Sequence, residues 1–143
     1  VIKPLNQDSA IGVMPLPNGG DIARGLSESL KFGPCLVEPF FTGKEITVGI
    51  LEIEGQSLAH PAIEIRTSDN EWYDYKNRYA PGQSEHIIPA HLENDVQKQL
   101  QKIAGTAHQI LGLRDLSRAD FIVANNNERT KQSTLKTLIF ANC

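Results

Sequence analysis

The 143-residue sequence has no apolar run near the roughly 20 residues that a membrane-spanning helix needs. It also has no block of Lys and Arg, and its formal net charge is −3. We therefore expect no nucleic-acid-binding surface, because phosphate binding needs concentrated positive charge. Its two cysteines, Cys35 and Cys143, make neither a disulfide framework nor a zinc site. With no signal peptide at its start, the sequence predicts a cytoplasmic protein that binds neither membrane nor nucleic acid.

Nucleotide-binding and metal-binding motifs with simple spacing are absent as well. The sequence contains neither GxxxxGK[ST] nor GxGxxG, which excludes a P-loop and a Rossmann site. The four histidines lack ligand spacing, and we expect His108 to be a packing or surface residue. The chain opens with Val1 rather than methionine, and Val1–Pro4 reads as the interior of a strand. We expect that the sequence begins within a longer protein.

Among the features present, the stretch Cys35–Leu51 predicts two strands joined by a short linker, with a carboxylate on each side of the join. Cys35–Val37 is a short apolar run that predicts a strand. Pro39 has no N–H and disfavours helix in the residue before it, so we expect this strand to end at Glu38. In the second strand, Ile46, Val48 and Ile50 alternate with Thr47 and Gly49, which is a period of two. On spacing alone, the two carboxylates could simply flank a hairpin-like connection.

Two amphipathic helices are predicted. Asp21 is a plausible N-cap, and Ile22, Leu26 and Leu30 follow at four-residue spacing, which predicts a helix to about Lys31 with this stripe in the core. A longer helix is predicted near residues 93–111. Its apolar stripe consists of Val96, Leu100, Ile103, Ala104, Ala107 and Ile110.

The remaining patterns predict an α+β fold. Ile11–Met14 and Pro61–Arg66 read as strands, and Glu52–Ser57 reads as a hairpin turn. We expect a mostly antiparallel sheet built from the strands near residues 35, 46, 62 and 117, with the helix near 93–111 packed on one face. Trp72–His86 is a long aromatic and charged loop, typical of a functional flap, although an ordered surface loop packed by its own aromatics would read the same.

Leu116–Val123 predicts the last regular strand. Arg118 and Asp120 are two residues apart, so their side chains project from one face, while Ala119, Phe121 and Val123 face the other way. Taken alone, an arginine and an aspartate in this arrangement could be a surface ion pair.

Several of these segments resemble the ATP-grasp superfamily, and within it the D-alanine–D-alanine ligases. The likeness rests on Leu36-Val-Glu-Pro-Phe followed by Gly43-Lys-Glu-Ile-Thr-Val-Gly-Ile-Leu51. It implies an ATP site in which Glu38 accepts the adenine amine and Glu45 the ribose hydroxyls. The linker residues Pro39, Phe40 and Phe41 would lie against the adenine ring. Carboxylates and apolar side chains suit these partners chemically.

The resemblance extends to the phosphate-binding loops. It implies that Lys3 touches ATP phosphate and that Ser9 lies near the phosphates and the substrate, although Asp8 replaces a glycine common in the family. The Trp72–His86 loop resembles the family's flap over the triphosphate, with Tyr79 at its tyrosine position. Arg78 stands where the family has lysine, which keeps the cation but replaces a point charge by a bidentate fork.

The resemblance also assigns roles to Arg118 and Asp120 on the last strand. It implies that Arg118 steadies the reacting carboxylate and that Asp120 binds magnesium, in an ADP-forming ligase that joins two D-alanines through an acyl phosphate. Hard oxygen ligands and an arginine donor suit this chemistry. The implied cofactors are ATP and magnesium, the implied substrate is D-alanine, and the family suggests a homodimer for the full-length protein.

The resemblance covers residues 1–123 and is lost in the tail, residues 124–143. The family continues with Glu-x-Asn-Thr, whereas this chain reads Asn125-Asn-Asn-Glu128. We therefore expect a partial ATP-grasp domain over 1–123, followed by an atypical tail from a truncated or frame-shifted coding sequence. The alternatives are a non-catalytic remnant or nucleotide-binding module, or an ATP-grasp ligase with other substrates. As given, the chain is expected not to join two D-alanines.

Overall fold

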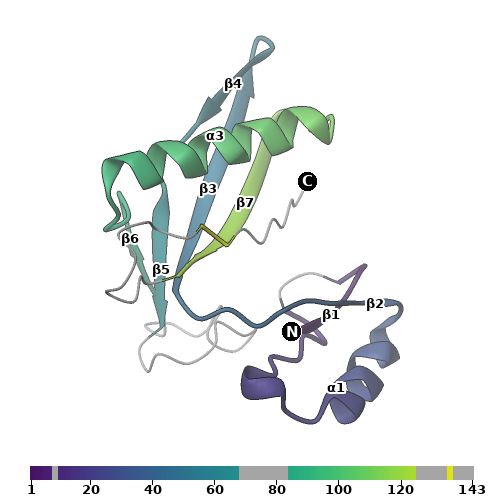
Figure 1. Cartoon of the computed structure of the whole chain (residues 1–143). Coiled ribbons are helices and arrows are strands. Elements are labelled where there is room, and N and C mark those ends of the chain that lie inside the picture. The colour runs from purple at the N-terminus through teal and green to yellow at the C-terminus, as the bar shows by residue number, and fades with distance from the viewer. Residues whose placement is uncertain (8–9, 68–83, 125–134, 137–143) are drawn as a thin grey trace. The chain divides into compact units, whose positions relative to one another are not determined.

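The computed structural model describes residues 1–7, 10–67, 84–124 and 135–136. The chain divides into two compact units, the first formed by Val1–Phe41 and Thr67–Ser84 and the second by Thr42–Arg66 and Glu85–Cys143. Figure 1 shows the elements of both units along the chain. Within the described residues, no helix is long and apolar enough to cross a membrane.

The first unit contains a two-stranded antiparallel sheet and a short helix. Strand β1 (Ile2–Pro4) pairs with β2 (Cys35–Val37). Between them lie the 3₁₀ turns η1 (Pro17–Gly19) and η2 (Leu30–Phe32) and the helix α1 (Ile22–Ser29). The side chain of Asp21 accepts a hydrogen bond from the Arg24 amide at 2.9 Å, which confirms the predicted N-cap.

Two predictions for this unit are wrong. Strand β2 does not join the main sheet, because its backbone pairs with β1 and belongs to the first unit. The β2–β3 connection is therefore a link between two sheets and not a hairpin. Residues 11–14 form no strand either: only Met14 pairs with Ile2, in an isolated bridge.

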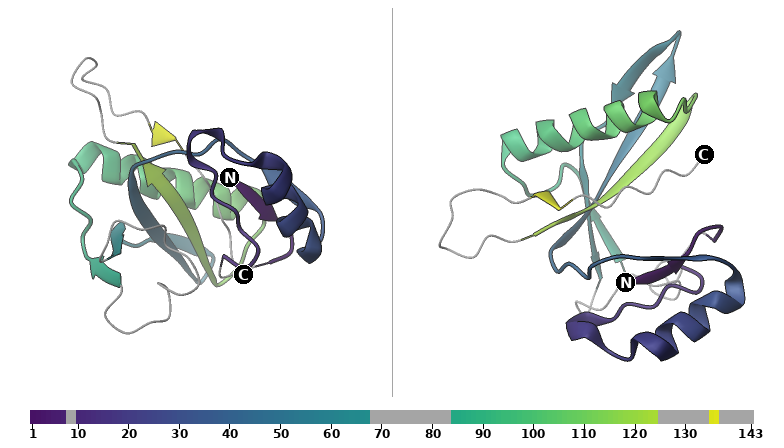
Figure 2. Two further views of the ribbon diagram at one scale, coloured as in Figure 1. Left: turned by 90° about the horizontal axis from the view of Figure 1, so that it is seen from below. Right: turned by 45° about the vertical axis from the view of Figure 1, so that its right-hand side comes forward.

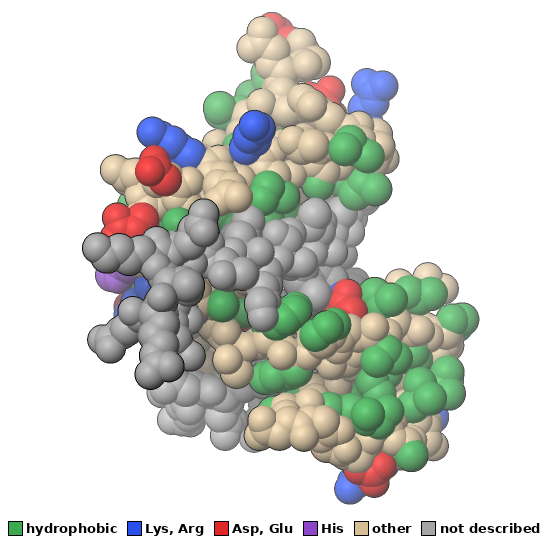
Figure 3. Space-filling model, viewed as in Figure 1, with side chains coloured by type: hydrophobic (Ala, Val, Ile, Leu, Met, Phe, Trp, Pro, Cys, Tyr) green, Lys and Arg blue, Asp and Glu red, His purple; other side chains and the backbone are tan. Residues whose placement is uncertain are grey.

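The apolar stripe of α1 was predicted to lie in the core, but it is exposed. Ile22 and Leu30 are 57% and 51% exposed, and Leu26 is exposed too. The helix instead buries its small residues Gly25 and Ser29, and the Ser29 hydroxyl donates to the Gly12 carbonyl at 2.7 Å. A side chain at Gly25 would meet Leu16 and Ile2, so only small residues allow this close approach. Hydrophobic side chains accordingly gather on the face of this unit that Figure 3 shows.

The second unit is a sheet with one long helix across it. The strands are β3 (Lys44–Ile53), β4 (Gln56–Ala59), β5 (Ile63–Thr67), β6 (Ser84–Ile87), β7 (Leu116–Val123) and the short β8 (Leu135–Lys136). Their order is β6-β5-β3-β7-β8, with β4 paired to β3, and β3 pairs antiparallel with β4, β5 and β7. Helix α3 (Asn94–Ile110) lies over one face, as the two views of Figure 2 show.

The core lies between this helix and one face of the sheet. Ile46, Val48 and Ile50 of β3 alternate inward, and Phe121 stands opposite Ile46 in the register with β7. Leu100 and Ala104 of α3 belong to the same buried cluster. The predicted strands 44–51 and 116–123 and the predicted helix are thus confirmed, except that Ile110 is 79% exposed at the helix end.

The sequence predicted His108 to be a packing or surface residue, and the structure shows a buried packing residue that makes hydrogen bonds. Its ring is buried where α3 ends on the sheet. Nδ1 lies 2.7 Å from the Ser117 hydroxyl on β7, and Nε2 lies 3.1 Å from Oε2 of Glu52 on β3. The Nε2–H donates to the carboxylate, which leaves Nδ1 to accept the hydroxyl proton of Ser117 in the neutral ring. The ring thereby links the helix to two strands.

Candidate functional site

The sheet of the second unit presents polar side chains on the face opposite α3. Strand alternation places Glu45, Thr47 and Gly49 on this face of β3, because Ile46, Val48 and Ile50 point into the core. In the antiparallel register, Thr47 stands opposite Asp120 and Gly49 opposite Arg118. The register thus brings three predicted site residues, Glu45, Arg118 and Asp120, to one face of two neighbouring strands.

Asp120 is held from two directions. Its Oδ1 accepts a hydrogen bond from the Thr47 hydroxyl at 2.7 Å and lies 3.0 Å from Nε of Arg118. Its Oδ2 accepts from Nη2 of Arg118, also at 3.0 Å. The guanidinium therefore binds the carboxylate through two parallel contacts, which is the strong geometry for this pair. The ion pair that the strand spacing left open as an alternative is present.

The carboxylate of Asp120 is chemically suited to bind magnesium. Asp120 is 27% exposed at its side chain and supplies a hard carboxylate oxygen. The described part of the chain contains no group of three or more His, Cys, Asp or Glu that could hold a metal ion. Magnesium is commonly bound through one or two carboxylates together with substrate phosphates and water, so a single carboxylate fits that mode of binding.

In the first unit, the predicted ATP residues Lys3 and Glu38 lie together. Nζ of Lys3 is 2.8 Å from Oε2 of Glu38, and both side chains are largely buried, at 10% and 19% exposed. Their strands make this contact possible, since the neighbouring Ile2 pairs with Val37. The linker residues Pro39, Phe40 and Phe41 follow Glu38 directly. Ser9, Arg78 and Tyr79 lie outside the residues that the structure describes.

On the helix side of the sheet, the buried carboxylate of Glu64 is the centre of a charge cluster. Its Oε1 accepts from Nε of Arg66 at 2.8 Å. Its Oε2 accepts from Nζ of Lys44 and from the amide of His91, each at 3.1 Å. Burial alone would raise the pKa of this carboxyl, but the three donors outweigh it and hold the pKa of Glu64 below its usual range.

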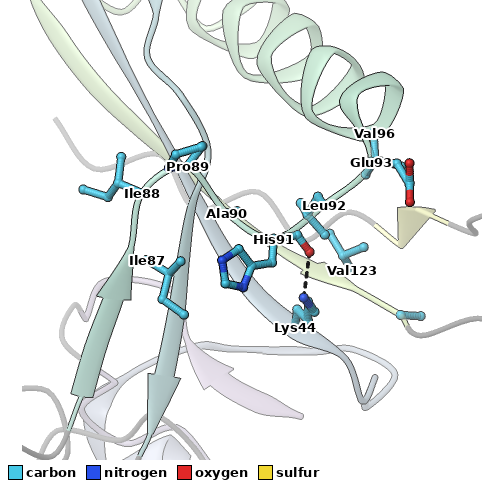
Figure 4. A pocket seen from close by; sticks show the side chains of 11 residues that line it. Lys44, Ile87, Ile88, Pro89, Ala90, His91, Leu92, Glu93, Val96 and Val123 are labelled. Carbon is cyan, nitrogen blue, oxygen red and sulfur yellow. Dashed lines mark hydrogen bonds between the residues drawn. The ribbon is translucent and has the colours of Figure 1, made fainter.

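Beside this cluster is a pocket of about 610 Å³ that shares none of the predicted site residues. Figure 4 shows it between the end of β6, the start of α3 and the strand ends at Lys44 and Val123. Nζ of Lys44 donates to the His91 carbonyl at 2.7 Å across it. Lys44 and Val123 are paired in the register and lie on the core side of the sheet. The pocket is therefore on the face opposite Glu45 and Asp120.

Sequence reasoning missed Thr47 and Glu64. Thr47 could have been found, because it lies two residues from Glu45 and therefore shares its face in a strand. Glu64 has the same two-residue spacing to Arg66, but its other two contacts have no such signal. Its acceptor role depends on Lys44 and His91, which are 20 and 27 residues away in sequence and meet it only in the folded sheet.

Comparisons with known proteins agree with this architecture. Residues 1–132 match the family model described as D-ala D-ala ligase C-terminus. The D-alanine–D-alanine ligase of Halalkalibacterium halodurans is 38% identical over 127 residues, covering 88% of this chain and 41% of that protein. The same-named protein of Methylobacterium radiotolerans is 37% identical over 123 residues, covering 84% and 39%. The chain thus spans about two-fifths of the length of these relatives.

Solved structures support the α+β fold, and with it the predicted ATP-grasp-like class. D-alanyl-alanine synthetase A from Vibrio cholerae matches with a TM-score of 0.76 and 22% identity, over 99% of this chain and 41% of that one. The VanG D-Ala:D-Ser ligase from Enterococcus faecalis matches with a TM-score of 0.69 and 23% identity, over 86% and 36%. The match to the family model over residues 1–132, together with the identity to the curated ligases, shows that this chain belongs to the D-alanine–D-alanine ligase family and corresponds to its C-terminal part.

Proposed function

We propose that this chain is the ATP-binding portion of a D-alanine–D-alanine ligase, an enzyme of peptidoglycan precursor synthesis in the cytoplasm. The observation that carries the proposal is the common face of β3 and β7, which presents Glu45, Asp120 and Arg118 through one register. Glu45 is assigned to the ribose hydroxyls and Asp120 to magnesium. Arg118 is assigned to the carboxylate that receives the γ-phosphate.

We further propose nucleotide-binding roles for residues of the first unit. Glu38 would accept the adenine amine, with Pro39, Phe40 and Phe41 against the ring, while Lys3 would contact phosphate. The Lys3–Glu38 ion pair is compatible with these roles, because a carboxylate oxygen accepts more than one hydrogen bond and an ammonium has three donors. Ser9 is proposed to act near the phosphates, and Arg78 and Tyr79 are proposed to belong to the flap over the triphosphate.

Bound magnesium would supply charge neutralisation at the β- and γ-phosphates. The chain's own contribution there is the orientation of Asp120 and a cation, Arg118, that is 44% exposed and able to turn to an incoming anion. Catalysis of phosphoryl and acyl transfer consists mainly of such positioning and charge stabilisation. A homodimer of the full-length protein remains part of the proposal.

Replacing Glu45 by alanine should weaken ATP binding by about 1–3 kcal/mol, which is the cost of losing charged hydrogen bonds to the ribose. Isothermal titration calorimetry of the parent and the variant with ATP and magnesium measures this directly. Asp95→Ala is the matched control, because Asp95 is an exposed carboxylate on α3, over the opposite face of the sheet. Equal affinity of parent and Glu45→Ala would remove Glu45 from the site.

We also expect that the chain alone does not join two D-alanines. Asp120 is the one magnesium carboxylate that matches the family pattern, since the tail lacks Glu-x-Asn-Thr after the strand. With Asp120 as the matched carboxylate, the chain would hold magnesium with fewer of its own ligands, and the charge developing on the phosphates would be less well neutralised. Phosphate release from ATP that depends on D-alanine, measured beside the full-length Halalkalibacterium halodurans ligase, tests this. Release by the chain that is lost in Asp120→Ala would contradict it and would favour a complete catalytic site.

A further inference from the structure

Thr47 makes a contact with Asp120 that neither the strand pattern nor the family resemblance predicted. It is 7% exposed, and its hydroxyl donates to Oδ1 of Asp120 at 2.7 Å. The two residues are direct cross-strand partners between β3 and β7, and on the other side Thr47 pairs with Ile63 of β5. Thr47 therefore lies on a central strand that has a paired strand on each side, and its side chain is buried. A β-branched residue in such a place has few rotamers, so the direction of its hydroxyl is fixed by the fold.

The two groups that hold Asp120 differ in how easily they can leave it. Arg118 contacts both carboxylate oxygens, but its long side chain is 44% exposed and can reorient. Thr47 is short and buried, so its contact with Oδ1 persists whenever the strands are paired. If Arg118 turns away, Oδ2 becomes available while Oδ1 still accepts the hydroxyl proton. The carboxylate then keeps one orientation and presents one defined oxygen to the open face.

We propose that Thr47 is a positioning residue that orients the Asp120 carboxylate for a divalent cation. The proposal rests on the proposed function, in which Asp120 is the magnesium ligand. A hydrogen bond to a ligating carboxylate restrains its rotation and lowers the entropy lost when the cation binds. Partners of this kind commonly change metal affinity by about 10–100-fold when they are removed.

The test compares a variant without the hydroxyl with one that keeps it. Thr47→Val preserves the branched shape and removes the donor, whereas Thr47→Ser preserves the donor. The probe is Mn²⁺ titrated into the purified chain with a non-hydrolysable ATP analogue, and free Mn²⁺ is measured by electron paramagnetic resonance. We expect Thr47→Val to lose about 10-fold or more in Mn²⁺ affinity. Thr47→Ser should stay close to the parent, and thermal unfolding should show that both variants are folded.

Two controls separate this role from others. Thr106→Val removes a hydroxyl that donates to the Lys102 carbonyl on the exposed side of α3, and it should leave Mn²⁺ affinity unchanged. If Thr47→Val does not fold, Thr47→Ala supplies the variant without a donor. The proposal is overturned if the hydroxyl-free variant binds Mn²⁺ like the parent, or if Thr47→Ser loses as much affinity as Thr47→Val.

Asp120→Asn distinguishes a failure of this proposal from a failure of the proposed function. If Asp120→Asn loses Mn²⁺ binding while the hydroxyl-free variant keeps it, the metal ligand stands and only the role of Thr47 is wrong. If Asp120→Asn binds Mn²⁺ like the parent, the metal assignment itself is wrong and the role of Thr47 is overturned with it. Dependence of ATP affinity on Glu45, measured separately, shows whether the nucleotide site survives that outcome.

Discussion

Phe121→Ala should destabilise the second unit by about 3–5 kcal/mol. Phe121 is 1% exposed and stands opposite Ile46 in the register, in the cluster that Leu100 and Ala104 complete from α3. Truncation removes apolar surface from the core and leaves a cavity that strands and helix can fill only in part. Because natural domains are stable by only about 5–15 kcal/mol, this is a large fraction of the total.

Urea unfolding followed by far-ultraviolet circular dichroism measures the loss in free energy of unfolding. Leu58→Ala is the control, because Leu58 is 59% exposed on β4 and its truncation should change stability by less than about 0.5 kcal/mol. Phe121→Leu keeps most of the volume and should fall between the two. Equal unfolding midpoints for Phe121→Ala and Leu58→Ala would show that the core does not depend on this ring.

The second unit follows closely from its sequence. Arg118 and Asp120 alternate with Ala119, Phe121 and Val123, and the structure has a strand over Leu116–Val123 with these three apolar residues buried. Helix α3 is also predictable, because its stripe is long and Val96, Leu100, Ile103 and Ala104 belong to the core or pack against it. Strand periodicity alone predicts that Arg118 and Asp120 lie on the same face of the strand. Long, regular patterns determine these elements because burial of one face dominates their energetics.

The first unit was predicted less well, and the reasons are physical. Periodicity identifies the stripe of α1 but not the partner that it faces, and here Gly25 and Ser29 make the close contact. A three-residue strand such as β2 carries no information on which strand it pairs with, so its assignment to the main sheet had no firm basis. Short elements depend on long-range contacts, which a local pattern does not contain.

The sequence proposes residue types for the candidate site but not their contacts. Glu38, Glu45, Arg118 and Asp120 are proposed as site residues through a family resemblance. The ion pair between Lys3 and Glu38 has no local sequence signal, and strand periodicity places Thr47 on the face of Glu45 without predicting its hydrogen bond to Asp120. These contacts join residues 35 and 73 positions apart. Only the strand register brings such distant groups together.

Glu64→Gln should destabilise the second unit by about 2–3 kcal/mol. The carboxylate is 3% exposed and accepts three hydrogen bonds, two of them from the cations Lys44 and Arg66. A neutral amide loses the charge that both cations face and turns an NH₂ group toward one of them. Charged hydrogen bonds contribute about 1.5–3 kcal/mol each, and the sum is reduced because Arg66 is 47% exposed and remains solvated. Glu28→Gln, which breaks an exposed pair with Lys31, should change unfolding little.

The same carboxylate makes stability depend on pH in a defined direction. The pKa of Glu64 is lowered in the folded state, so the folded protein binds this proton less readily than the unfolded chain does. Its contribution is therefore fully present above the unfolded pKa of a glutamate, about 4.3, and is lost as the pH falls below it toward the lowered folded pKa. Urea midpoints measured from pH 7 to pH 3 should fall for the parent and for Glu28→Gln, and should fall less for Glu64→Gln. Identical pH dependence in Glu64→Gln and the parent would show that other groups carry the acid sensitivity and that the cluster does not hold a charged Glu64.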